Sequence, residues 1–142
     1  RGTAYHALGE NERAIEDYDE VIRINPDYAA AYNNRGNAYN DLEQHARALE
    51  DYDEAIRLDP NDPDVYINRG NILSGMGEYE RATENYTEAI RINPNYSEAY
   101  HNRRVMYLRL GLYEESEQDL AKVSELKVGS GGDSTGGNGS SQ

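Results

Sequence analysis

Three prolines, Pro26, Pro60 and Pro94, recur at a spacing of 34 residues and strongly restrict how this chain can fold. The residues between them recur in the same register, since Asn-Arg-Gly stands at 34–36 and again at 68–70. A fixed period of this length indicates a repeat array in which each unit packs on the next. Because Pro cannot continue a helical hydrogen-bond ladder, each proline is expected to end a helix of its unit.

Each unit carries two segments with helical periodicity. The first has Tyr32, a small residue four positions later and an aromatic residue three beyond that, which places all three on one helix face. The second has Ala48, Tyr52 and Ala55, again at spacings of four and three. The predicted helices are 1–8, 11–24, 29–41, 45–58, 63–75, 79–92, 97–110 and 113–126.

This pattern closely resembles the tetratricopeptide repeat, whose units combine an early aromatic residue, a following Gly, an Ala–aromatic–Ala second helix and a closing Pro. The resemblance implies an all-α, right-handed α-α superhelix (a solenoid) of about four helix pairs, the first of them truncated. The expected units are 1–28, 29–62, 63–96 and 97–128, followed by a Gly/Ser-rich disordered tail at 129–142. The fourth unit departs from the pattern, because Arg104 replaces the Gly and Leu120 the aromatic. Its stacking positions, Glu117 and Ser124, are polar and suit a terminal cap.

Composition argues against several classes of function. A net charge of −13 opposes contact with nucleic acid or with an anionic membrane surface. The chain has no Cys, and its three His are widely separated, so no metal site is predicted. No catalytic constellation and no cofactor-binding motif is present, and we expect no enzyme activity, no catalytic residue and no cofactor.

An arginine column predicts ion pairs inside the units. Arg35 and Arg103 stand on first helices at a position that the family often fills with Leu, and a charge there needs a partner. The antiparallel second helices place Asp51 and Asp119 opposite them. We therefore expect Arg35–Asp51 and Arg103–Asp119 pairs with a structural role.

Asparagine is the candidate binding residue. Asn is a poor helix former, yet it recurs on the first helices, which line the groove in the resembled family. Its amide offers donors and an acceptor, which suits an extended peptide backbone. The predicted peptide-binding residues are Asn33, Asn34, Asn37, Asn68, Asn71, His101 and Asn102. Asn34, Asn68 and Asn102 stand 34 apart, like the asparagine ladder of some family members. The alternative is that these amides merely solvate the groove.

Some family members instead hold a C-terminal carboxylate with two Asn and two cationic residues. Asn37 and Asn68 match the Asn pair, but Glu98 and Asn102 stand where the cations belong. A buried carboxylate needs those cations, so this mode is not expected.

The sequence therefore favours a protein–protein interaction scaffold that binds an extended peptide segment, with a neutral or basic partner. The alternative is a structural or regulatory part of a larger enzyme or assembly factor whose catalytic portion lies upstream. The chain begins inside a repeat, so a fragment of a longer protein is expected, and self-association through the truncated N-terminal end is a third hypothesis. A cytoplasmic location is favoured.

Overall fold

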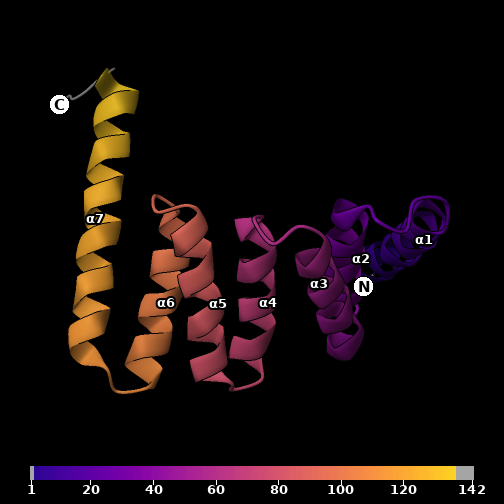
Figure 1. Cartoon of the computed structure of the whole chain (residues 1–142), viewed down its shortest axis with the longest axis horizontal. Coiled ribbons are helices and arrows are strands. Elements are labelled where there is room, and N and C mark those ends of the chain that lie inside the picture. Colours follow the sequence, from indigo (N-terminus) through magenta and orange to yellow (C-terminus); the bar gives the residue numbers. More distant parts are fainter. Residues whose placement is uncertain (1, 137–142) are drawn as a thin grey trace. The chain divides into compact units, whose positions relative to one another are not determined.

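A computed structural model describes the backbone of residues 2–136 and the side chains of residues 9–127. Within that range the chain forms helices and turns and has no strand. The helices are α1 (Gly2–Ile24), α2 (Ala29–Asp41), α3 (His45–Leu58), α4 (Pro63–Gly75), α5 (Tyr79–Ile92), α6 (Ser97–Arg109) and α7 (Tyr113–Gly136) (Figure 1). The boundaries predicted for 29–41, 45–58, 63–75 and 79–92 are confirmed.

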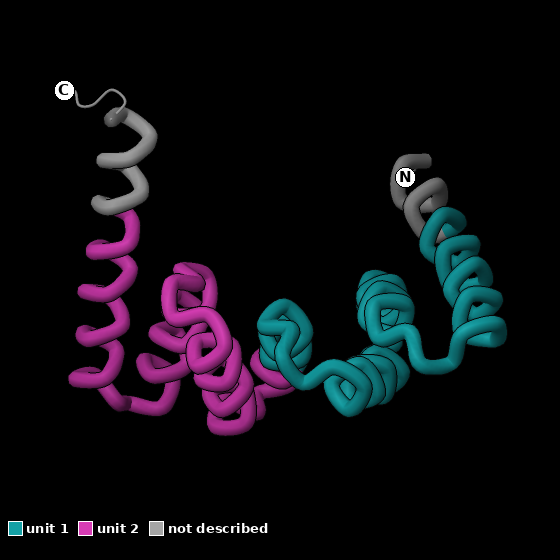
Figure 2. The backbone as a smooth tube through the Cα atoms, turned by 45° about the horizontal axis from the view of Figure 1, so that its top comes forward, with its two compact units in different colours: residues 1–72 teal, residues 73–142 magenta. Residues whose placement is uncertain are grey.

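The chain divides into two compact units (Figure 2). Unit 1, residues 1–72, contains α1, α2, α3 and most of α4. Unit 2, residues 73–142, contains the end of α4 followed by α5, α6 and α7. In unit 1, α2 packs on both α1 and α3, and in unit 2, α6 packs on both α5 and α7. Consecutive helices therefore pack as pairs, as the repeat pattern predicts.

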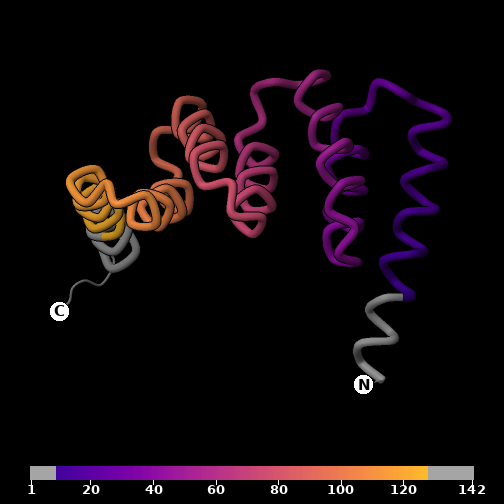
Figure 3. The backbone as a smooth tube through the Cα atoms, turned by 90° about the horizontal axis from the view of Figure 1, so that it is seen from below, coloured from indigo at the N-terminus to yellow at the C-terminus, as the bar shows by residue number. Residues whose placement is uncertain are grey.

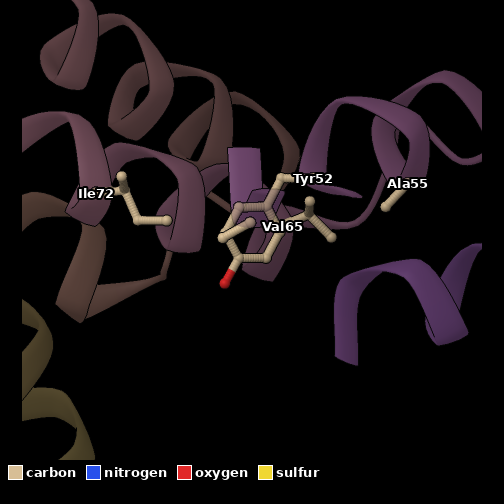
Figure 4. Packing of buried hydrophobic residues seen from close by; sticks show 5 residues of the cluster. Tyr52, Ala55, Val65 and Ile72 are labelled. Atoms are coloured by element: carbon tan, nitrogen blue, oxygen red, sulfur yellow. The ribbon is translucent and has the colours of Figure 1, made fainter. Parts of the chain in front are cut away.

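The core of unit 1 forms around Tyr52, which is only 1% exposed. Ala48 and Ala55 from α3 surround it together with Val65 and Ile72 from α4 (Figure 4). Leu49 and Ile56 of α3, which occupy the repeat positions of Glu117 and Ser124, pack against this cluster, so α3 buries its apolar face on the following helix. Burying a large side chain in this way stabilises the fold by about 1.5–3 kcal/mol.

The loops between successive repeats are stabilised by a tyrosine hydrogen bond that recurs along the chain. Each first-helix tyrosine donates its hydroxyl to the carbonyl oxygen of the proline six residues earlier, which satisfies a loop acceptor. The bonds join Tyr32 to Pro26 at 3.1 Å, Tyr66 to Pro60 at 3.2 Å, and Tyr100 to Pro94 at 2.8 Å. These three tyrosines therefore order the loop between repeats, and two of them, Tyr66 and Tyr100, are also buried in the core.

The turns inside the helix pairs use a left-handed residue. Glu43, Gly77 and Gly111 have φ angles of 61°, 82° and 77°. The residue after each one donates its backbone N–H back to the helix, for example from Gln44 to Tyr39 O at 2.9 Å. Glycine suits this conformation and glutamate does not, so Glu43 is strained where the two glycines are not.

The prediction of separate helices at 1–8 and 11–24 is wrong. The described backbone forms one helix, α1, that passes through Gly9. The part of α1 that Figure 3 draws in colour lies beside α2, on which α1 packs. A helix of eight residues is marginal by itself, and an uninterrupted helix keeps the backbone hydrogen bonds that a turn at Gly9 would remove.

At the other end of the chain, α7 runs to Gly136, beyond the predicted end at 126. Residues 137–142 of the predicted disordered tail lie outside the described residues, as do the side chains from 128 onward. The disorder predicted for 129–142 therefore stays a prediction.

Candidate functional site

Two arginine–aspartate pairs hold the helix pairs that carry the candidate site. In unit 1, Arg35 Nε and Nη2 donate to the two carboxylate oxygens of Asp51 at 2.9 and 2.8 Å. In unit 2, Arg103 donates to Asp119 in the same way at 2.9 and 2.7 Å. Both aspartates are buried. The hydrogen bond that Arg35 donates to Asp51 is the main cause that raises the pKa of Arg35, and the bond to Asp119 does the same for the pKa of Arg103. Both predicted pairs are confirmed.

Three arginines at a spacing of 34, Arg35, Arg69 and Arg103, also donate to the second helix of the preceding repeat. This contact was not predicted from the sequence. The three contacts are Arg35 Nη1 to Asp19 at 2.8 Å, Arg69 Nη1 to Asp53 at 2.9 Å, and Arg103 Nη1 to Thr87 at 3.2 Å. The signal in the sequence was that each of these three arginines has a polar residue 16 positions before it. One guanidinium therefore joins helices of two successive repeats, which the planar arginine fork can do and a lysine cannot.

Tyrosine rings flank the same guanidinium groups. Arg35 Cζ lies 5.6 Å from the ring centroid of Tyr32 and 5.8 Å from that of Tyr39. These distances are within the range of cation–π attraction. The first helix is thus fixed by its second helix, by the preceding repeat and by its own aromatic residues, which gives its asparagines a rigid base.

The asparagine face of unit 1, defined here as Asn33, Asn37 and Asn68, lies on two first helices. Asn68 Nδ2 on α4 donates to Asn33 Oδ1 on α2 at 3.1 Å. The structure therefore brings Asn68 to Asn33, whereas the predicted ladder places Asn34 at that step. All three side chains are half-buried. The Asn33–Asn68 bond orients two amides and leaves Asn33 Nδ2 as a donor and Asn68 Oδ1 as an acceptor.

Asn37 is oriented by a hydrogen bond from Tyr52, a buried core residue of α3. The hydroxyl of Tyr52 donates to Asn37 Oδ1, which leaves Asn37 Nδ2 as the donor of this amide. Burial is the main cause that raises the pKa of Tyr52, so the hydroxyl stays protonated and remains a donor. Gly36 makes this arrangement possible, because a Cβ there would lie 2.8 Å from Tyr52 Cε1.

The other predicted site residues lie on three first helices. Asn34 and Asn71 are exposed on α2 and α4 of unit 1. His101 is exposed and Asn102 is half-buried, and both lie on α6 in unit 2.

The chemistry of the asparagine face is hydrogen bonding by neutral amides. Among the described side chains no group of three or more His, Cys, Asp or Glu is arranged to hold a metal ion. No helix in the described range is long and apolar enough to cross a membrane. The arrangement can therefore bind polar groups through hydrogen bonds.

Comparison with known proteins agrees with this architecture. The TPR repeat family matches residues 2–42 and 36–77, and the tetratricopeptide repeat family matches residues 63–96. No curated relative matches the sequence.

Solved structures give the same result. The crystal structure of MamA is 27% identical and superposes with a TM-score of 0.82, covering 89% of this chain and 74% of MamA. The second TPR of Spaghetti (RPAP3), bound to the HSP90 peptide SRMEEVD, is 30% identical with a TM-score of 0.66, over 69% of this chain and 91% of that one. The first TPR of Spaghetti, bound to the same peptide, is 26% identical with a TM-score of 0.67, over 69% and 78%. The all-α fold is therefore confirmed, and the chain belongs to the tetratricopeptide repeat family.

Proposed function

We propose that this chain is a non-enzymatic protein-interaction scaffold that holds an extended peptide segment on its asparagine face. Membership of the family supports the scaffold role, and the two Spaghetti TPRs are structures with a bound peptide. The observation that carries the proposal is the Asn33–Asn68 hydrogen bond. It presents one donor and one acceptor side by side, which is the complement of a single peptide group.

Preorganisation supports the same reading. Asn33, Asn37 and Asn68 are each oriented by a hydrogen bond within the protein before any peptide arrives. Side chains that are already ordered lose less conformational freedom on binding, so more of each hydrogen bond appears as affinity. The proposal extends to Asn34 and Asn71 in unit 1, and to His101 and Asn102 on α6, each as a separate contribution to peptide contact.

The partner is proposed to be neutral or basic. The chain carries a net charge of −13, and Asp41 is exposed at the end of α2, the helix that carries Asn33 and Asn37. Negative potential near a binding face disfavours acidic partners and speeds encounter with basic ones.

A direct test of partner charge uses the peptide SRMEEVD of the Spaghetti complexes. The cationic positions of the family's carboxylate site are Glu98 and Asn102 in this chain. We expect no saturable binding of SRMEEVD near about 1 μM by calorimetry, because nothing offsets the desolvation of its carboxylates. Tight binding that disappears when its C-terminus is amidated would contradict the proposed partner chemistry.

The binding site is tested with peptides selected from an unbiased library against the intact chain. Asn33→Ala/Asn68→Ala is expected to weaken the best peptide by about tenfold or more, since two peptide hydrogen bonds of about 1 kcal/mol each are lost. Asn61→Ala is the matched control, because Asn61 is an exposed asparagine of the same unit that lies in a turn. Equal weakening by the control, or undiminished binding by the double variant with its helical circular dichroism intact, would refute the assignment. A library that yields no peptide would refute the function itself.

A further inference from the structure

A second surface of the molecule departs from the repeat pattern at the α6–α7 turn of unit 2. The exposed side chains here are Leu108, Leu112 and Tyr113, and Tyr113 is 66% exposed. The same turn in unit 1 presents Gln44 and His45 instead, and His45 bonds to Asn40 at 2.9 Å. Both turns have a left-handed residue at the corresponding position, Glu43 or Gly111, and the same backbone return bond, so backbone geometry does not require apolar residues here.

The α6–α7 turn also contributes Leu110 to the lining of a cavity. It has a volume of about 200 Å³ and is lined by Gly77, Glu78, Tyr79, Glu80, Arg81 and Leu110. The first five come from the α4–α5 turn and the start of α5, and Leu110 comes from the α6–α7 turn. Figure 1 shows these two turns at the same end of unit 2. Met76, in the α4–α5 turn, adds another exposed apolar side chain, at 54%.

The charge around the cavity is negative. Among its lining residues, the carboxylates of Glu78 and Glu80 outnumber the single guanidinium group, that of Arg81. In the adjoining helix ends, Glu114 and Glu115 lie in the first turn of α7 and Arg109 in the last turn of α6. Arg81 lies 3.9 Å from Glu78, so part of its charge is already compensated inside the protein. Such a rim favours a partner that carries cations, and it disfavours the anionic surface of a membrane.

We propose that these two turns form a second docking site, which we call the apolar edge, for a protein segment with one large apolar side chain flanked by Lys or Arg. The apolar side chain enters the cavity beside Leu110, and it packs against Leu112 and Tyr113. The flanking cations face the glutamates. Clustered exposed apolar residues mark interaction sites when a polar rim surrounds them, which is the arrangement found here. The apolar edge is independent of the asparagine face, which belongs to unit 1.

The test uses the full chain and two fluorescein-labelled peptides, Gly-Lys-Lys-Leu-Lys-Lys-Gly and the same peptide with Ala in place of Leu. Fluorescence anisotropy near physiological salt is expected to show about fivefold tighter binding of the Leu peptide, because the cavity removes its apolar side chain from water. Equal affinity of the two peptides would show that only non-specific attraction to an acidic protein is present, and would overturn the proposal.

The matched variant takes its residues from unit 1 of the same chain. Leu112→Gln/Tyr113→His copies Gln44 and His45, which already occupy this turn geometry, so the fold should be kept. It is expected to reduce binding of the Leu peptide to the level of the Ala peptide, while Asn61→Ala, an exposed turn position of unit 1, leaves the difference between the two peptides unchanged. Undiminished preference for the Leu peptide in the turn variant would overturn the proposal. So would a concentration-dependent dimer in sedimentation that the turn variant abolishes, since the occupant would then be a second copy of the chain.

Discussion

The α2–α3 pair of unit 1 and the α6–α7 pair of unit 2 share an electrostatic frame but differ in how they pack. Each has an arginine that donates two hydrogen bonds to a buried aspartate, at 2.7–2.9 Å. In unit 1 the helices meet through Gly36 and the ring of Tyr52. In unit 2 the same two positions are Arg104 and Leu120, so the large residue stands on the other helix.

The two pairs also differ in how completely their inner side chains are buried and hydrogen-bonded. Tyr52 is 1% exposed, whereas Leu120 is 40% exposed. Arg104 Nε is buried without a hydrogen-bond partner among the described residues. Glu117 and Ser124, the polar stacking positions of α7, are exposed. The comparison teaches that the ion pair sets the geometry of a helix pair, while the degree of core packing varies from unit to unit.

Breaking the ion pair should have the largest effect in both regions. Arg35→Met is expected to lower the free energy of unfolding by about 3 kcal/mol, because it leaves the buried Asp51 carboxylate unpaired. Arg103→Met should cost a similar amount through Asp119. Urea denaturation measures both. The further change Asp51→Leu should recover most of the loss in the Arg35 variant, and a double variant as unstable as the single one would show that the charge was not the cause.

Substitutions at Gly36 and at the equivalent Arg104 should change stability less than loss of the ion pair, and by different amounts in the two units. Gly36→Ala should destabilise by about 2 kcal/mol, since its Cβ would lie 2.8 Å from a ring that cannot move in a filled core. Arg104→Ala should change stability by less than about 0.5 kcal/mol, because it removes an unsatisfied buried nitrogen together with some packing.

A double-mutant cycle sharpens this contrast. The double variant Gly36→Ala/Tyr52→Leu has a larger residue on the first helix and a smaller one on the second, as unit 2 does. Its loss of unfolding free energy should be less than the sum of the losses in the two single variants. Strict additivity would mean that Gly36 and Tyr52 do not constrain one another.

The turns should respond in opposite directions. Glu43→Gly is expected to stabilise unit 1 by about 1 kcal/mol, because Glu43 has a φ of 61° that glycine adopts without strain. Gly111→Ala should destabilise unit 2 by a similar amount, since its φ is 77°. Thermal denaturation by circular dichroism gives both values, and two changes of the same sign would contradict the turn argument.

The contact with the preceding repeat should have the smallest effect. Arg35 meets a charged group, Asp19, whereas Arg103 meets the neutral hydroxyl of Thr87. Asp19→Ala should cost about 0.5 kcal/mol at low salt and less at high salt, because Asp19 is half-exposed and its charge is screened. Thr87→Ala should show no salt dependence, and a salt dependence equal to that of Asp19→Ala would refute the distinction.

Much of this structure follows from periodicity. The helices from 29 to 92 and the Arg35–Asp51 pair could be predicted because a spacing of 34, read with antiparallel helices, determines which residues face each other. The bond between Asn33 and Asn68 could not, because it depends on the lateral offset between two first helices. The continuity of α1 was missed because Gly9 aligns with Glu43, Gly77 and Gly111 but does not form a turn.

The candidate site was therefore predicted by residue type and only partly by arrangement. The sequence placed asparagines on the first helices, but the contact from Tyr52 to Asn37 requires the depth of the core to be known. The apolar edge is absent from the sequence-based hypotheses, because the pattern places Leu112 in a turn and Tyr113 at the start of the helix 113–126, and their exposure depends on the fold.

The central claim is that a peptide backbone bonds to the amides of Asn33 and Asn68. Side-chain amide NMR resonances of these residues, followed during titration with the library-selected peptide, test it most directly. We predict that both sets of resonances shift and saturate with the same Kd that anisotropy gives, while the amide of Asn61 stays unchanged. Saturable binding of the peptide with no shift at Asn33 or Asn68 would contradict the claim.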